Sequence, residues 1–245
     1  MFELRLDTHP DLSIQVEHVG AERTPLLIID NLVDRPDDLV TYAASACTLA
    51  PPTDMYPGLR APAPESYVEV LRKGLTEAIN TAYGLPDLDL HSAISYLCVV
   101  TTRPEDLKPV QCMPHIDGTA VNSFSTVHYL CSPSYAGTSL YRHRRTGYEL
   151  VPDFRHDRYR AVLEQELRET PWAARDYING DTDVFERIAS AAVAFNRMVL
   201  YPSHALHSAD IGRDFAFDPD PRRGRFSVNS RIQMRPKGFQ SRPWF

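Results

Sequence analysis

The chain has 245 residues, of which 43% are hydrophobic and 24% charged; these proportions exclude a wholly disordered chain and suit one large domain or two small ones. Its 26 basic and 32 acidic residues give a net charge of −6, which disfavours nucleic-acid binding because binders of that class carry a basic surface. No apolar run approaches the ~20 residues of a membrane helix, and the first residues, MFELRLDTHP, lack the apolar core of a signal peptide. We therefore expect a cytoplasmic protein without a membrane partner.

Two helices and one short strand are predicted in the N-terminal part of the chain. The aliphatic residues 26–29 are typical of a buried strand. Pro36 and the acidic residues after it favour the first turn of a helix. A second helix is indicated by apolar residues at every third or fourth position over 68–82, and Gly84 is expected to end it. The proline-rich stretch 50–64 between them is predicted to be a loop.

Beyond this point the apolar residues follow the period of strands. The clearest strand covers 225–234, where polar and apolar residues alternate and Arg225, Ser227 and Arg231 share the polar face. Earlier strands are expected at 93–100, 124–131, 138–142 and 198–201. Two segments between the strands, 157–169 and 184–194, are predicted to be helices.

These elements predict a single domain of α+β, mainly β class. Residues 1–88 would provide helical support, residues 89–149 and 195–236 the strands, and residues 150–194 a helical insert. The architecture favoured by this order is a jelly-roll-like β-sandwich with helices on one side. The four cysteines form no C-x-x-C pair and are expected to be buried, reduced thiols.

One pair of side chains points to metal chemistry. His115 and Asp117 form an H-x-D triplet, and residues two apart face the same way on an extended segment. The other H-x-D triplet, at 9–11, is set aside because it precedes the core strands and contains a proline. His204 and His207 both follow the strand at 198–201, so either can supply a second imidazole. Two histidines and a carboxylate from separate strands form a facial triad, which suits non-haem Fe(II) and O2 chemistry.

The last predicted strand adds a candidate anion site. Arg225 begins it, and Ser227 lies on the same face. An arginine fork can bind a carboxylate through two hydrogen bonds, and the serine hydroxyl can add a third. A dicarboxylic cosubstrate that chelates the metal at its other end would suit this arrangement. Arg231 shares the same face and is the alternative anchor.

The order of these motifs resembles the Fe(II)/2-oxoglutarate-dependent dioxygenase superfamily, nearest its prolyl 4-hydroxylase-like branch. The likeness covers roughly residues 90–145 and 195–235. Within it, residues 123–130 resemble the strand after the H-x-D triplet, and residues 137–141 resemble the glycine-led strand that follows. The resemblance implies a double-stranded β-helix, which is a jelly-roll or cupin-like barrel.

The resemblance also implies roles for particular residues. The ligands of Fe(II) would be His115, Asp117 and His207. The far carboxylate of 2-oxoglutarate would be bound by Arg225, with Ser227 and Tyr129 beside it. With O2, such a site implies an oxidoreductase that hydroxylates a C–H bond of a small molecule or peptide. The chain departs from the family in two places: 18 residues separate His207 from Arg225, and the insert at 150–194 is long.

Other interpretations remain open from the sequence. The protein could be a non-catalytic or regulatory metal-binding jelly roll, or a cupin-type enzyme without 2-oxoglutarate, which would not need Arg225. His128 is expected to be structural, on the strand face opposite Tyr129. The basic run 142–145 is a candidate contact for an acidic substrate, with a solvated charge cluster as the alternative. Arg60 lies in a turn that could reach the site.

Overall fold

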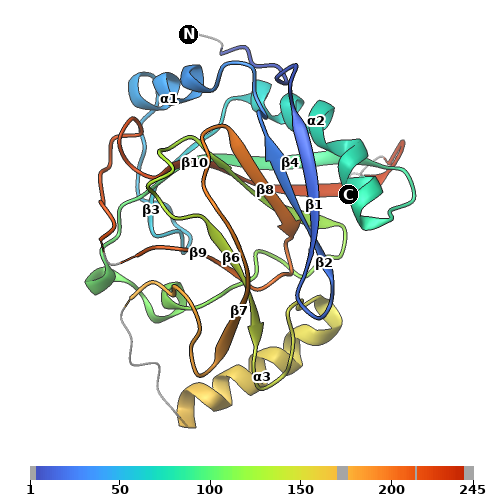
Figure 1. The fold of residues 1–245 in the computed structure, drawn as a ribbon, viewed down its shortest axis with the longest axis vertical. Helices are drawn as coiled ribbons and strands as arrows, with labels where there is room; N and C mark the ends of the chain where they lie inside the picture. Colours follow the sequence, from blue (N-terminus) through green and yellow to red (C-terminus); the bar gives the residue numbers. More distant parts are fainter. Residues whose placement is uncertain (1–3, 170–175, 213, 240–245) are drawn as a thin grey trace, which may run out of the picture.

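The computed structural model describes residues 4–169, 176–212 and 214–239, and within them the chain is mostly antiparallel β (Figure 1). A large sheet of seven strands spans the molecule. Its strands, in the order in which they lie across the sheet, are β1 (Ser13–Val19), β2 (Thr24–Asp30), β8 (Arg197–Pro202), β5 (Ser123–Tyr129), β10 (Phe226–Pro236), β4 (Leu88–Val100) and β3 (Gly58–Pro62).

A second, smaller sheet faces the middle of the large one. It contains β7 (Phe185–Ala191), β6 (Thr138–His143) and β9 (His207–Ala209), in that order. A single bridge between His115 and His207 adds the segment before β5 to the free edge of β9. No ladder joins the two sheets among the described residues, so the arrangement is a sandwich and not a closed barrel.

Two helices cover the outer face of the large sheet, α1 (Pro36–Ser45) and α2 (Glu65–Tyr83). The buried side of α2 includes Leu71 and Leu75, which join one core with the apolar face of β10. Gly84 ends α2 in the left-handed conformation with φ of 59°, as predicted from the sequence. The third helix, α3 (Asp153–Glu169), packs instead against the small sheet through Tyr159.

The inner face of the large sheet has a separate core. Strand alternation places Val199 and Tyr201 of β8 on this face, where they pack with Leu140 of β6 and Ala191 of β7. The neighbouring Leu200 points to the helix-covered face and belongs to the other core. The interior between the two sheets is therefore narrow and filled at one end.

Three expectations from the sequence differ from the structure. The predicted helix at 184–194 is strand β7, because seven residues with mixed polarity are ambiguous in isolation and pairing with β6 decides their conformation. The predicted loop at 50–64 contains β3, an edge strand whose last residue is Pro62, a position that tolerates proline. The third difference concerns the helical regions: residues 1–88 supply three strands besides the supporting helices, and residues 150–194 are part helix and part strand.

In the part of the chain that the structure describes, no helix has both the length and the apolar character to cross a bilayer.

Candidate active site

The H-x-D segment and β9 hold two histidines face to face. Backbone N–H groups of His115 and His207 each donate to the other residue's carbonyl, both at 2.9 Å. This pairing places the two imidazole rings 4.3 Å apart, centroid to centroid. Asp117 is held next to them because its N–H donates to the carbonyl of Ser203 at 2.8 Å.

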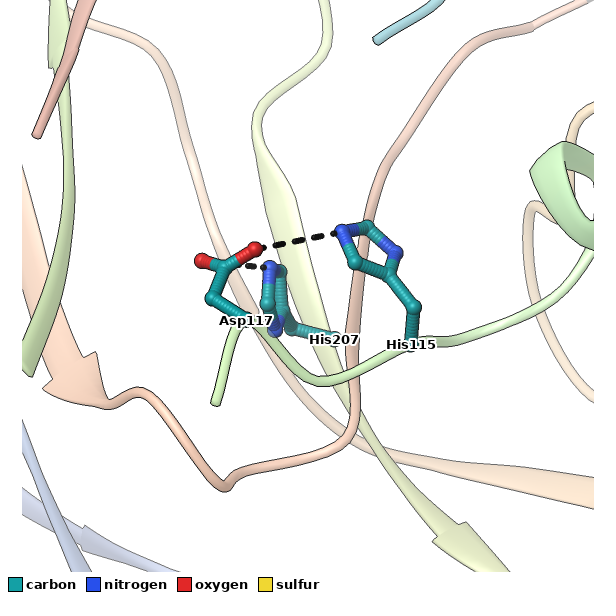
Figure 2. Close-up of side chains that lie close together, drawn as sticks. All are labelled: His115, Asp117 and His207. Atoms are coloured by element: carbon teal, nitrogen blue, oxygen red, sulfur yellow. Dashed lines mark ion pairs between the residues drawn. The ribbon is translucent and has the colours of Figure 1, made fainter. Parts of the chain in front are cut away.

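The three side chains converge on one point (Figure 2). Nε2 of His115 lies 3.7 Å from Oδ1 of Asp117, and Nε2 of His207 lies 3.5 Å from Oδ2. The three potential ligand atoms are within 4.8 Å of one another, and no other such group of three exists among the described residues. His204, the alternative histidine, is buried and is not part of this group.

Neighbouring groups orient the donor atoms. Nδ1 of His207 donates to the carbonyl of Ala205 at 3.0 Å; since a carbonyl can only accept, the tautomer leaves the Nε2 lone pair facing Asp117. The hydroxyl of Ser125 donates to Oδ2 of Asp117 at 2.5 Å. Contacts of this kind fix ligand orientation around protein metal ions.

The local electrostatics favour the protonation states that a metal requires. Burial within the site and the charge on His207 together lower the pKa of His115 to about 4, against the opposing effect of Asp117. Burial alone would raise the pKa of Asp117, but the histidine charges and the Ser125 hydroxyl hold it below its usual value. A neutral imidazole and an ionised carboxylate are the forms that bind metal.

This group opens into a cavity of about 610 Å³ between the two sheets. The side chains of His115 and Asp117 are 54% and 36% exposed, and both line this cavity. The wall also includes Arg225 and, farther along β10, Asn229 and Arg231. The polar face predicted for the last strand is thus the face that looks into the cavity.

Arg225 is a buried cation whose hydrogen bonds go to backbone carbonyls. It is 2% exposed; its Nε donates to the carbonyl of Ala136 at 2.9 Å and its Nη2 to the carbonyl of Gly137 at 2.8 Å. Its guanidinium carbon lies 5.5 Å from the centre of the Tyr129 ring. Among the described residues no carboxylate forms an ion pair with it, although a buried charge costs several kcal/mol unless it is compensated.

Ser227 and Tyr129 lie behind the cavity wall. Ser227 is fully buried and its hydroxyl donates to Oδ1 of Asn229 at 2.8 Å. The hydroxyl of Tyr129 donates to Oγ1 of Thr138 at 2.7 Å. Their partners, Asn229 and Thr138, line the cavity, whereas Ser227 and Tyr129 do not. Both predicted residues therefore contact wall residues and not the open space.

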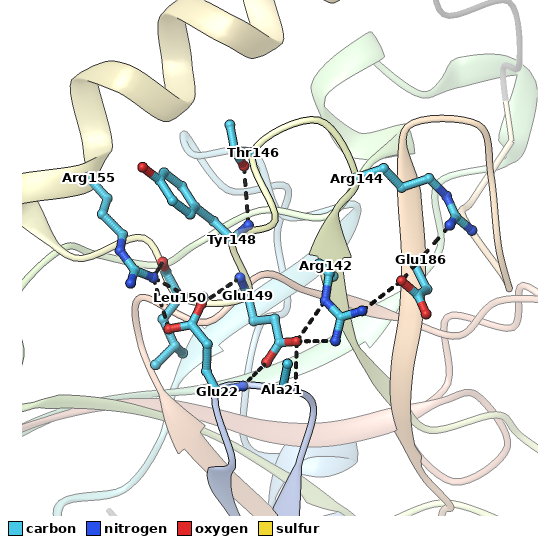
Figure 3. Close-up of polar contacts among 10 residues, drawn as sticks. All are labelled: Ala21, Glu22, Arg142, Arg144, Thr146, Tyr148, Glu149, Leu150, Arg155 and Glu186. Atoms are coloured by element: carbon cyan, nitrogen blue, oxygen red, sulfur yellow. Dashed lines mark hydrogen bonds and ion pairs between the residues drawn. The ribbon is translucent and has the colours of Figure 1, made fainter.

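Of the other residues singled out from the sequence, some lie away from the cavity and one lines it. His128 is buried between the hydroxyl of Tyr67 and Oδ1 of Asn196, each at 3.0 Å, which agrees with a structural role. The three arginines of the run 142–145 all form ion pairs with carboxylates outside the cavity (Figure 3 shows Arg142 and Arg144). Arg60 does line the cavity, paired with Asp54.

Two cavity residues that the sequence analysis did not single out stand out in the structure. The ring of Tyr201 packs on the ring of His207, with centroids 4.7 Å apart. The hydroxyl of Tyr56 is buried and has no hydrogen-bond partner among the described residues. Both residues line the cavity. A sequence signal existed only for Tyr201, which alternates with the core residue Val199 along β8.

Comparisons with known proteins place the chain in a family. The model of a family of unknown function, DUF6445, matches residues 10–232. No curated protein matches the sequence.

Several solved structures resemble the fold at low identity. HygX from Streptomyces hygroscopicus, with nickel and 2-oxoglutarate bound, has 11% identity and a TM-score of 0.46 over 89% of this chain and 85% of its own. The non-heme alpha ketoglutarate dependent epimerase SnoN from nogalamycin biosynthesis has 12% identity and a TM-score of 0.47 over 91% of this chain and 89% of its own. AviO1 from Streptomyces viridochromogenes has 13% identity and a TM-score of 0.41 over 98% of this chain and 95% of its own.

Proposed function

The chain belongs to the family DUF6445, and for this member we propose an Fe(II)- and 2-oxoglutarate-dependent dioxygenase that hydroxylates a C–H bond of a small molecule or peptide. One observation carries the proposal: a His–Asp–His group and a buried arginine that has no acidic partner among the described residues open into the same cavity. The first suits a divalent metal with open positions, and the second requires an anion. A dicarboxylate that chelates the metal satisfies both.

The donor set fits iron. Two imidazoles and one carboxylate are the ligands of the facial triad, which leaves three adjacent positions for other groups. Ligand atoms at about 2.1 Å from a metal in octahedral geometry are on the order of 3 Å apart. The separations of 3.5 and 3.7 Å from Asp117 to the two Nε2 atoms need only small movements to reach that value. His115, Asp117 and His207 are the proposed ligands.

Arg225 is the proposed anchor for the far carboxylate of 2-oxoglutarate. Its burial excludes competing water, which strengthens a charge-assisted hydrogen bond. Arg231 is exposed and donates through Nη1 to the carbonyl of Asp117 at 3.2 Å, a position beside the metal ligands and unsuited to the far end of a chelating cosubstrate. In this proposal Ser227 and Tyr129 support the anchor through Asn229, Thr138 and the Arg225 guanidinium.

We extend the proposal to the fold type, a double-stranded β-helix. Its support is that consecutive segments alternate between the two sheets. The large sheet contains β4, β5, β8 and β10, and between them the chain passes through the small sheet at His115, at β6 and β7, and at β9. A likeness to the prolyl 4-hydroxylase-like branch rests on the sequence motifs alone, and the cytoplasm stays the expected location.

Each part of the site has a defined task. Bound Fe(II), 2-oxoglutarate and O2 would together supply the oxidising power for C–H hydroxylation. The residues of this chain hold the metal at one face, orient the cosubstrate through Arg225 and keep bulk water from the inner end of the cavity. Tyr201 packs on His207 and restricts the ring to one orientation.

The proposal is tested by anaerobic addition of Fe(II) and 2-oxoglutarate to the purified protein. We expect a weak visible charge-transfer band, followed by slow release of succinate from 2-oxoglutarate when O2 is admitted. His207→Ala should abolish the band, and His204→Ala, a matched change three residues away, should preserve it. A band that requires His204 contradicts the ligand assignment. Metal binding without any response to 2-oxoglutarate indicates a cupin-type enzyme, and a band without succinate indicates a non-catalytic protein.

A further inference from the structure

Arg231 is a cation at the open side of the cavity, and the proposed function gives it no role. It is exposed, lines the cavity and forms no ion pair with a carboxylate among the described residues. Its Nη1 donates to the carbonyl of Asp117, which holds the guanidinium next to the metal ligands. In the ladder between β10 and β4 its direct partner is Ile94, so the two side chains are neighbours on the same face.

The charges around the cavity leave Arg231 uncompensated, on the premise that the proposed function is correct. Asp117 and the chelating end of 2-oxoglutarate would neutralise Fe(II), and the other carboxylate would neutralise Arg225. Arg60 already pairs with Asp54. The loaded site therefore retains one unmatched positive charge, which attracts an anion into a partly desolvated cleft.

An apolar surface lies beside this charge. Ile94 is 51% exposed, and Met55 and Val110 are 43% and 53% exposed. All three line the same cavity. Exposed apolar side chains that gather at one opening commonly mark a binding site. The opening thus combines one positive charge with a group of apolar contacts.

We propose that the primary substrate is a small organic acid, whose carboxylate is bound by Arg231 and whose apolar body packs on Ile94, Met55 and Val110. Arg231 is then a specificity-determining residue, distinct from the cosubstrate anchor at Arg225. A peptide with a free C-terminus presents the same carboxylate, so both sources of the group enter the test.

The test compares carboxylic acids with their uncharged amides on the full chain loaded with Zn(II) and saturating 2-oxoglutarate, which prevents turnover. The probes are octanoate and octanamide, 3-phenylpropanoate and 3-phenylpropanamide, and a short apolar peptide with a free or an amidated C-terminus. Dissociation constants come from calorimetry or ligand-observed NMR. We expect each small acid to bind about 10-fold more tightly than its amide, and the free peptide to show no such preference.

Variants locate the preference. Arg231→Gln should remove the difference between acid and amide, whereas Arg231→Lys should retain part of it. Arg235→Gln, a matched change on β10 outside the cavity lining, should leave the difference intact. Equal binding of acid and amide by the unaltered protein, or a preference that survives Arg231→Gln, overturns the proposal. A preference only for the free peptide reassigns the substrate class to peptides.

The same protein separates this inference from the proposed function. A titration with 2-oxoglutarate alone reports whether the cosubstrate binds. If it does not bind, the proposed function fails, and the acid–amide comparison is repeated in Arg225→Gln protein without cosubstrate, where Arg225 no longer competes for the probe. A preference that persists there and disappears in the Arg225→Gln, Arg231→Gln double variant supports an acid site independent of 2-oxoglutarate; no preference overturns it.

Discussion

Two clusters of side chains each contain a deeply buried charged group, and they differ in how their charges are paired. In the first, the carboxylate of Glu149 is 2% exposed and accepts the backbone N–H groups of Ala21 and Glu22 as well as the guanidinium of Arg142 (Figure 3). Arg142 also pairs with Glu186 at 2.9 Å. Every charge there has a partner within the chain.

The cavity around the His–Asp–His group is the opposite case. Arg225 is as deeply buried as Glu149 but has no acidic partner among the described residues. The hydroxyl of Tyr56, which also lines the cavity, is buried and has no partner among the described residues. Because buried polar groups in native proteins are normally satisfied, a saturated cluster indicates a structural clamp and an unsatisfied one indicates a place for a ligand.

The largest effect is expected at the metal ligands. Asp117→Ala and His207→Ala should each abolish iron binding and 2-oxoglutarate turnover, since the triad loses one of three ligands. The thermal unfolding temperature of metal-free Asp117→Ala protein should change little, because this carboxylate is partly exposed to the cavity. Iron content by elemental analysis and unfolding by circular dichroism are the measurements. A variant that loses stability as well as iron would blur the distinction between the two clusters.

A substitution in the clamp should have the reverse effect. Glu149→Ala removes the carboxylate that Arg142 and two backbone N–H groups share, and loss of one member of a buried pair costs about 3–5 kcal/mol. Urea unfolding measures this loss. Glu186→Ala removes the half-exposed partner of the same arginine and should cost no more than about 1 kcal/mol. The affinity of folded Glu149→Ala protein for 2-oxoglutarate should be unchanged.

Substitution of the cosubstrate anchor Arg225 should cause a smaller loss, which affects only the affinity for 2-oxoglutarate. Arg225→Gln removes a charge-assisted bidentate contact of about 1.5–3 kcal/mol, so the Kd for 2-oxoglutarate should rise about 10- to 150-fold. Calorimetry with Zn(II)-loaded protein measures it, and Zn(II) affinity should hardly change. Arg231→Gln is the control and should have a mild effect on 2-oxoglutarate. The reverse ranking of the two variants would move the anchor to Arg231.

The smallest effect concerns a buried histidine whose hydrogen bonds are complete. Burial lowers the pKa of His128 to about 4, against the opposing effect of its bond to Asn196. Because the folded pKa lies below the unfolded value of about 6.5, the unfolded chain binds the proton first, and stability is lost as the pH falls from about 6.5 toward 4. Between pH 6.5 and 5.5 the free energy of unfolding should fall by about 1 kcal/mol through this group.

Urea unfolding at both pH values, in the unaltered protein and in His128→Gln, measures this contribution. The variant should show the smaller dependence on pH, because glutamine does not titrate. An equal dependence in the two proteins would assign the acid sensitivity to other histidines. NMR titration of the His128 imidazole provides a direct check and should find it neutral down to about pH 4.

The periodic spacing of apolar residues predicted most of the strands and helices. The alternation along β10 predicted which face holds Arg225 and Arg231, and the apolar spacing of α2 with its terminal Gly84 predicted that helix and its end. These features depend on residues two to four positions apart, which secondary structure places on a common face. The short strand β7 has no such pattern of its own, and only its pairing with β6 made it a strand.

By itself, the sequence determined the proximity of His115 to Asp117 and the shared face of the last strand, because both follow from neighbouring positions in the chain. The residue pattern alone left His204 and His207 open, and the family resemblance favoured His207. The physical reason for that choice is tertiary, since it is the pairing of His207 with His115 across 92 residues of chain that brings the two imidazoles together. The tertiary structure alone decided that Arg225 is buried with no counterion in the described part of the chain, and that Tyr56 and Tyr201 border the cavity. These properties arise from contacts between distant segments, whose packing no local pattern encodes.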